Sequence, residues 1–155
     1  MSTYTIEREI EIDAPVGGVW RTITEPDQIG RWLGDAVELE PRPGANGTIT
    51  FRKDTDDPFV VDITVVAAEP PHRFSFRWCY PPGEGATETN STLVTFTLVA
   101  DGDDRTKLRV VESGLDQMDI ADAEKQKFFE QHSHGWQEQG DRLRDLFASG
   151  DASSP

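Results

Sequence analysis

One long apolar stripe at helical spacing lies near the end of the chain, and it constrains the fold more than any other feature. Its members recur at steps of three and four residues, which places them on one face of an α-helix: Phe128, Phe129, His132, Trp136, Leu143, Leu146 and Phe147. The pattern predicts an amphipathic helix whose apolar stripe extends over about five turns, with Asp119 or Asp122 as the cap at its start. Such a helix can bury its stripe only if the rest of the chain offers an apolar surface.

That surface is predicted to be a β-sheet. Seven segments with alternating or β-branched apolar residues are separated by turn residues and are predicted as strands: residues 4–12, 36–40, 47–52, 59–68, 73–80, 91–100 and 106–113. Two short helices are predicted between the first two strands, over residues 16–24 and 25–33, the second ending at Gly34. An antiparallel sheet with one apolar face needs cover, and only the C-terminal helix is long enough to supply it. We therefore expect an α+β fold in which a curved antiparallel sheet of seven strands wraps around a long C-terminal helix.

The composition narrows the classes of partner. The 155-residue chain is long enough for one domain, placed at residues 1–148, with a disordered tail at residues 149–155. Its net charge of −14 repels phosphate backbones and anionic headgroups, so neither nucleic acid nor a membrane is expected as a partner. Cys79 is the single cysteine, which excludes an intramolecular disulfide and suits a reducing compartment. Since no signal-peptide pattern and no long apolar run is present, we expect a cytoplasmic protein.

Two charged residues fall on strand positions that otherwise carry apolar side chains. Arg8 shares one face of the first strand with Ile10, and Glu112 shares one face of the last strand with Val110. A buried charge is costly unless it is paired. Both side chains are therefore expected to reach a cavity and bind the polar end of a ligand, or to pair with each other or with another group. The alternative is that they lie near the sheet ends and reach solvent.

The histidines and the cysteine give no sign of a metal site or a nucleophile. His132 lies on the apolar stripe of the final helix, where a histidine is more often a hydrogen-bonded core residue than a catalyst. His134 is two positions further on, so the two rings cannot chelate one metal, and the i,i+4 histidine pair of helical zinc sites is absent. His72 lies in a Pro-Pro-His-Arg turn, and Cys79 has no base or cationic neighbour that would activate it. We predict no metal, no cofactor and no catalytic residue, with Cys79 in a structural role.

Several short motifs along the chain resemble those of one family. They are Ile12-Asp13-Ala14-Pro15, Val19-Trp20, Thr24-Glu25-Pro26, Arg31-Trp32, Glu112-Ser113-Gly114-Leu115, and Gly135-Trp136 followed by Leu143. Together they are similar to the START/Bet v1-like (SRPBCC) superfamily, and within it to the activator of Hsp90 ATPase homologue 1-like group. The resemblance implies a helix-grip fold with a ligand cavity between the sheet and the last helix. Relatives of this kind bind lipids, hormones, polyketides or other apolar molecules, and some act as cyclases.

Aromatic residues are abundant for one sheet and one helix. An aromatic stripe is usually plain core, but the implied fold leaves a cavity, and small-molecule sites are apolar cavities with a few polar groups. We therefore expect Arg8, Glu112 and His132 to orient a ligand between aromatic walls formed by Trp20, Trp32, Phe51, Phe74, Phe76, Trp78, Phe96, Phe128 and Trp136. The Gly/Pro-rich loop at residues 81–90 is expected to gate the mouth of this cavity.

Three functions are compatible with these features. The leading hypothesis is a binding domain for a small apolar or aromatic molecule, without catalytic residues of its own. The resemblance alone suggests a second, a cochaperone-like domain that binds an Hsp90-type chaperone. A third is a cyclase or hydrolase-like enzyme that uses polar groups of the cavity as general acid or base, which requires Arg8, Glu112 or His132 to face that cavity.

Overall fold

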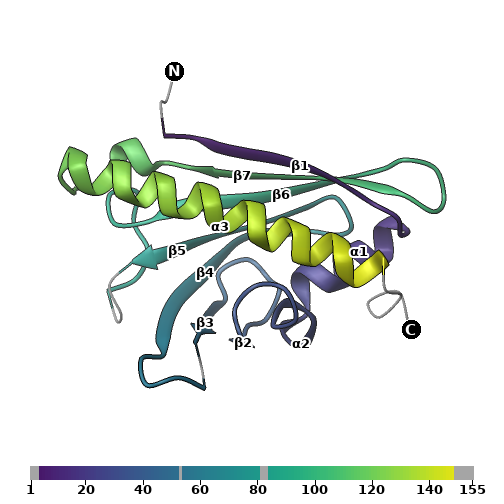
Figure 1. Ribbon diagram of the computed structural model, residues 1–155, viewed down its shortest axis with the longest axis horizontal. Helices are drawn as coiled ribbons and strands as arrows, with labels where there is room; N and C mark the ends of the chain where they lie inside the picture. Colours follow the sequence, from purple (N-terminus) through teal and green to yellow (C-terminus); the bar gives the residue numbers. More distant parts are fainter. Residues whose placement is uncertain (1–3, 53, 81–83, 149–155) are drawn as a thin grey trace.

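The computed structural model describes residues 4–52, 54–80 and 84–148, without the side chains of Cys79 and Ala148. One antiparallel sheet of seven strands has the order β1-β7-β6-β5-β4-β3-β2. A long helix, α3, crosses one face of this curved sheet, and two short helices close one end (Figure 1). The elements in chain order are β1 (Ile6–Ile12), α1 (Val16–Thr24), α2 (Pro26–Ile29), β2 (Ala36–Glu38), β3 (Asn46–Phe51), β4 (Phe59–Glu69), β5 (Arg73–Tyr80), β6 (Thr92–Ala100), β7 (Thr106–Ser113), the 3-10 helix η1 (Leu115–Gln117) and α3 (Asp122–Ala148). The predicted α+β architecture is confirmed.

The boundaries follow the predicted ones closely, with one larger difference. Elements α1, β5 and β7 begin and end where predicted, and the other strand ends differ by one or two residues. The prediction that the second helix extends through Leu33 is wrong, because α2 ends at Ile29 and continues as a turn. Gly30 is the C-cap of α2. The turn then buries the Trp32 indole, whose Nε1–H donates to the carbonyl of Thr22 at 2.9 Å.

The central strands β5, β6 and β7 present a continuous row of side chains to α3. In register, Phe76 lies opposite Val94 on β6, and Val94 lies opposite Glu112 on β7. Because cross-strand neighbours share a face of the sheet, Glu112 faces the same side as these two apolar residues. Its strand β7 alternates buried and more exposed positions, as its sequence predicts.

Aromatic rings fill the middle of the space between the sheet and α3. Phe74 and Phe96 stack with ring centroids 6.4 Å apart, and Trp32 meets the edge of Phe96 at 6.0 Å. Trp136 of α3 packs edge-on against Phe96 at 5.9 Å. Aromatic pairs in such offset and edge-to-face arrangements stabilise a core beyond their burial alone. Packed aromatic rings therefore fill the centre of the fold.

Some sequence features lie outside this description. The tail at residues 149–155 and the first part of the predicted gating loop, residues 81–83, are outside the described residues.

Among the described helices, none combines the length and the apolar character that crossing a membrane requires.

Candidate functional site

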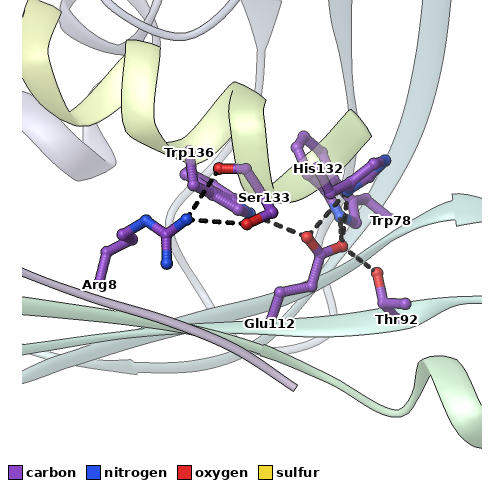
Figure 2. A network of polar contacts seen from close by, with 7 residues as sticks. All are labelled: Arg8, Trp78, Thr92, Glu112, His132, Ser133 and Trp136. Atoms are coloured by element: carbon purple, nitrogen blue, oxygen red, sulfur yellow. Dashed lines mark hydrogen bonds and ion pairs between the residues drawn. The ribbon is translucent and has the colours of Figure 1, made fainter. Parts of the chain in front are cut away.

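A buried carboxylate lies where the sheet meets α3. Glu112 is only 2% exposed, and its side chain extends from β7 toward the helix (Figure 2). Its inward direction follows from strand parity, since Leu108 and Val110 on the same face of β7 are also buried. The sequence prediction that Glu112 points inward agrees with this placement.

Four side chains donate hydrogen bonds to Glu112. The indole Nε1–H groups of Trp78 and Trp136 donate to Oε2 and Oε1 at 2.9 and 2.8 Å, and the Thr92 hydroxyl donates to Oε2 at 2.5 Å. The Nδ1 atom of His132 lies 2.8 Å from Oε1 and 3.0 Å from Oε2. We call these five residues the Glu112 cluster. They come from β5, β6, β7 and α3, so one carboxylate joins three strands to the helix.

The cluster keeps Glu112 ionised. Burial by itself would raise the pKa of the Glu112 carboxyl, because it penalises the charged form. The hydrogen bond and the charge of the His132 ring, with the hydrogen bonds from Thr92 and Trp78, outweigh burial and lower this pKa below its ordinary value of 4.5. An ionised carboxylate only accepts hydrogen bonds, so the Nδ1 atom of His132 must carry a proton.

A pocket of about 460 Å³ lies beside this cluster, between α3, the segment after α2 and the facing ends of β3 and β4. We call it the α3 pocket. Its apolar lining is Leu33, Phe51, Phe59, Val61, Trp78 and Trp136. Its other lining residues are Gly34, Asp35, Arg52, Gln131, His132, Gly135, Gln139 and Arg142. Glu112 lies behind this lining, and it contacts the pocket only through Trp78, His132 and Trp136.

Gly135 leaves the helix side of the α3 pocket open. A Cβ atom built at this position meets no atom within 4 Å, so the space above the glycine is empty. In a helix interior glycine is about 1 kcal/mol less favourable than alanine. Gly135 therefore leaves space beside the pocket at a position where alanine would stabilise α3.

The predicted cavity residues separate into two groups. Phe51, Trp78, His132 and Trp136 line the α3 pocket. The others pack elsewhere: Trp32, Phe74, Phe76 and Phe96 are buried in the solid core, Trp20 packs against Phe74, and Phe128 stacks on the His132 ring at 3.8 Å. The open space lies at one end of the sheet because aromatic rings occupy the middle. The described part of the predicted gating loop, residues 84–90, contributes nothing to this lining.

Arg8 and Glu112 do not meet. The Arg8 guanidinium reaches α3 at Ser133, where its Nη2 donates to the side-chain oxygen at 2.8 Å and to the backbone carbonyl at 3.2 Å (Figure 2). In register, Arg8 lies opposite Val110 and Ile6 lies opposite Glu112, so the two charged residues are offset along the strands. Of the alternatives predicted for Arg8, the structure shows the one in which its side chain pairs with a group other than Glu112, here Ser133.

Sequence reasoning missed most of the polar lining. Gln131, Gly135 and Gln139 follow one another at four-residue steps on α3, and such steps place residues on one side of a helix. That spacing was the available signal, but polar residues beside an apolar stripe ordinarily face solvent. No sequence pattern around Arg52 or Arg142 indicated that these residues line a pocket.

The remaining candidates lie apart from the pocket. His134 pairs with Glu138 at 2.9 Å on the exposed side of α3, and His72 is exposed. The Cys79 side chain lies outside the described residues. Across the described residues, no three His, Cys, Asp or Glu side chains are grouped so that they could hold a metal ion.

Comparisons with known proteins agree with this architecture. The sequence model of the family described as "Activator of Hsp90 ATPase homolog 1-like protein" matches residues 13–148. Protein MLL2253 from Mesorhizobium loti is 26% identical, with a TM-score of 0.75 over 95% of this chain and 98% of its own. CalU16 from Micromonospora echinospora is 25% identical, with a TM-score of 0.64 over 95% and 75% of the two chains. The Aha1 dimer from Colwellia psychrerythraea shares the fold at 17% identity, with a TM-score of 0.70 over 92% and 94%. No curated protein matches the sequence. The predicted family resemblance and helix-grip fold are confirmed.

The Glu112 cluster predicts a large stability effect for Glu112→Gln. The substitution places an amide NH₂ against side chains that themselves donate, so at least one buried hydrogen bond becomes a donor–donor contact. We expect a loss of about 3 kcal/mol in the free energy of unfolding, measured by chemical denaturation at neutral pH. The matched control is Glu7→Gln, which removes a half-exposed ion pair with Arg109 and should cost less than about 1 kcal/mol. Equal costs for the two variants would contradict a stabilising role of the cluster.

The lowered pKa of Glu112 predicts a specific acid dependence. Because the folded-state pKa lies below the ordinary value of 4.5, the unfolded chain takes up this proton first on acidification. The stabilisation is therefore complete above pH 4.5 and is lost as the pH falls from there through the folded-state pKa. Denaturation series on wild type and Glu112→Gln should show their stability difference shrinking below pH 4.5. A difference that grows on acidification would contradict an ionised Glu112.

Proposed function

The chain belongs to the activator of Hsp90 ATPase homolog 1-like family, and we propose that it binds a small apolar or aromatic molecule in the α3 pocket. The observation that carries the proposal is the pocket itself, about 460 Å³ beside Gly135. Pockets for small molecules are typically several hundred Å³, largely apolar and supplied with a few polar groups. The α3 pocket has this size, and its lining combines apolar side chains with an equal number of polar or charged ones.

The Glu112 cluster makes the inner wall of the pocket apolar. Trp78 and Trp136 both line the pocket, and both direct their only polar group, the indole N–H, to Glu112. A ligand in the pocket can therefore contact only the apolar carbon surfaces of these two indoles. Phe51 and Val61 extend this apolar wall from β3 and β4. An aromatic or aliphatic ligand would replace water along these surfaces, which is the main source of affinity in such sites.

Polar groups complete the pocket. Asp35, Arg52 and Arg142 are part of its lining, and Arg52 is also held by the Asp57 carbonyl at 3.0 Å. Among the described lining residues there is no serine, threonine or cysteine that could serve as a nucleophile. We therefore propose a binding domain that has no hydroxyl or thiol nucleophile in this lining.

Filling the space at Gly135 tests the pocket directly. We expect the neutral fluorescent probe N-phenyl-1-naphthylamine to bind wild type with one-to-one stoichiometry and increased emission. Gly135→Phe should lower its affinity at least tenfold, because the new ring extends into space that is empty in wild type. Gly135→Ala is the matched control, which should retain binding and gain about 1 kcal/mol of stability from the better helix propensity of alanine.

Two results would contradict the proposal. One is the absence of probe binding to wild type, and the other is equal binding to wild type and to a folded Gly135→Phe. Native mass spectrometry of the purified protein, followed by denaturing extraction, would then identify any natural molecule that it carries.

Chaperone binding is a second candidate function, because the family is described by its similarity to an activator of the Hsp90 ATPase. At the start of β4, Phe59 and Val60 are each 50% exposed and offer an apolar contact surface. If this surface serves a chaperone, the protein should raise the ATPase rate of Hsp90 from the same organism. Replacing Phe59 and Val60 by serine should reduce that stimulation. An unchanged rate together with no complex on size-exclusion chromatography would contradict this candidate.

A further inference from the structure

His132 is held in one orientation at the edge of the α3 pocket. Its Nδ1 is bound to Glu112, its ring stacks on Phe128 at 3.8 Å, and Trp78 meets it edge-on at 5.6 Å. Three contacts from three different directions leave the imidazole little freedom to turn. The ring is nevertheless not sealed, since its side chain is 20% exposed and it belongs to the pocket lining.

The contacts determine which nitrogen is available to a ligand. The Nδ1 proton is committed to the ionised Glu112, so Nε2 is the ring nitrogen that remains for a ligand. Nε2 has no hydrogen-bond partner among the described residues. It is also absent from the polar atoms that are both unpartnered and fully enclosed, so it is accessible. A ligand in the pocket can therefore reach it.

The chemistry at Nε2 selects for a particular group. A neutral imidazole accepts a hydrogen bond there, whereas a protonated imidazole donates one. An acidic hydroxyl, such as that of a phenol or an enol, matches both states, because it can donate as O–H or accept as O⁻. In either case one proton is shared between the ligand oxygen and Nε2, and the Glu112 carboxylate behind the ring stabilises a charged imidazole.

We propose that the ligand of the α3 pocket is an aromatic or enolic molecule whose acidic hydroxyl hydrogen-bonds to Nε2 of His132, with Glu112 as the positioning residue behind the ring. This inference rests on the proposed binding function and names its ligand class. The ionised Glu112 lies on the other side of the imidazole from the pocket. Asp35, Arg52 and Arg142 are the other charged groups in the lining.

Three probes of similar size separate the alternatives: 2-naphthol, its methyl ether 2-methoxynaphthalene, and 2-naphthoate. We expect wild type to bind 2-naphthol about tenfold more tightly than the ether, since the ether cannot donate. His132→Phe should retain the ether and lose the preference, because the ring stacking remains while Nε2 is removed. The control His134→Phe, which changes an exposed histidine on the same helix, should keep the preference.

The outcomes distinguish this inference from the proposed function. If no probe binds to wild type, or if Gly135→Phe binds all of them as wild type does, the pocket proposal fails and this inference fails with it. If binding is sensitive to Gly135→Phe but 2-naphthol and its ether bind equally, only the assignment of the acidic hydroxyl is overturned. Tightest binding of 2-naphthoate would likewise overturn it, in favour of an anion site.

A measurement on wild type alone guards against misfolding of the His132 variant. Nitrogen-15 NMR of the imidazole rings should show the Nε2 resonance of His132 shifting on addition of 2-naphthol, while its Nδ1 resonance changes little. The ether should leave both resonances near their starting positions. A 2-naphthol complex in which Nε2 does not shift would overturn the proposal without recourse to any substitution.

Discussion

A single ionised carboxylate, buried among aromatic rings, holds the sheet and the long helix together. Glu112 accepts hydrogen bonds from Trp78 on β5, Thr92 on β6, and His132 and Trp136 on α3. An isolated charge at this depth would be strongly destabilising, and four donors are what make it tolerable. The same requirement fixes how α3 lies on the sheet, because the helix must bring two donors one turn apart to the same carboxylate.

The cluster also separates the solid part of the structure from the open part. On one side, the rings of Phe74, Phe96 and Trp136 fill the space beneath α3. On the other side lies the α3 pocket, where Gly135 leaves a gap in the helix surface. Trp136 borders both regions, and its N–H is taken by Glu112. The wall that faces the pocket is therefore apolar, while His132 is left as a polar group with a defined orientation.

Membership of the family explains the architecture but does not choose between its functions. A pocket that is lined by two indoles and an oriented imidazole favours a small ligand, whereas the exposed apolar residues Phe59 and Val60 offer a surface to a protein partner. Phe59 belongs to both features. The two proposed functions thus share one end of the sheet.

The sequence by itself determined the order of the strands and α-helices and the direction of Glu112. The period-two pattern of β5 and β7 and the helical spacing of α1 gave their limits without error, because burial of one face selects residues at that period. The same parity placed Glu112 inward. The tertiary structure alone decided its partners, since the register of β5, β6 and β7 and the path of α3 bring to Glu112 residues that lie up to 34 positions away from it. It also decided where the cavity lies, because the space left open depends on which aromatic rings meet across the sheet and the helix, and that packing is a property of the assembled side chains rather than of any one segment.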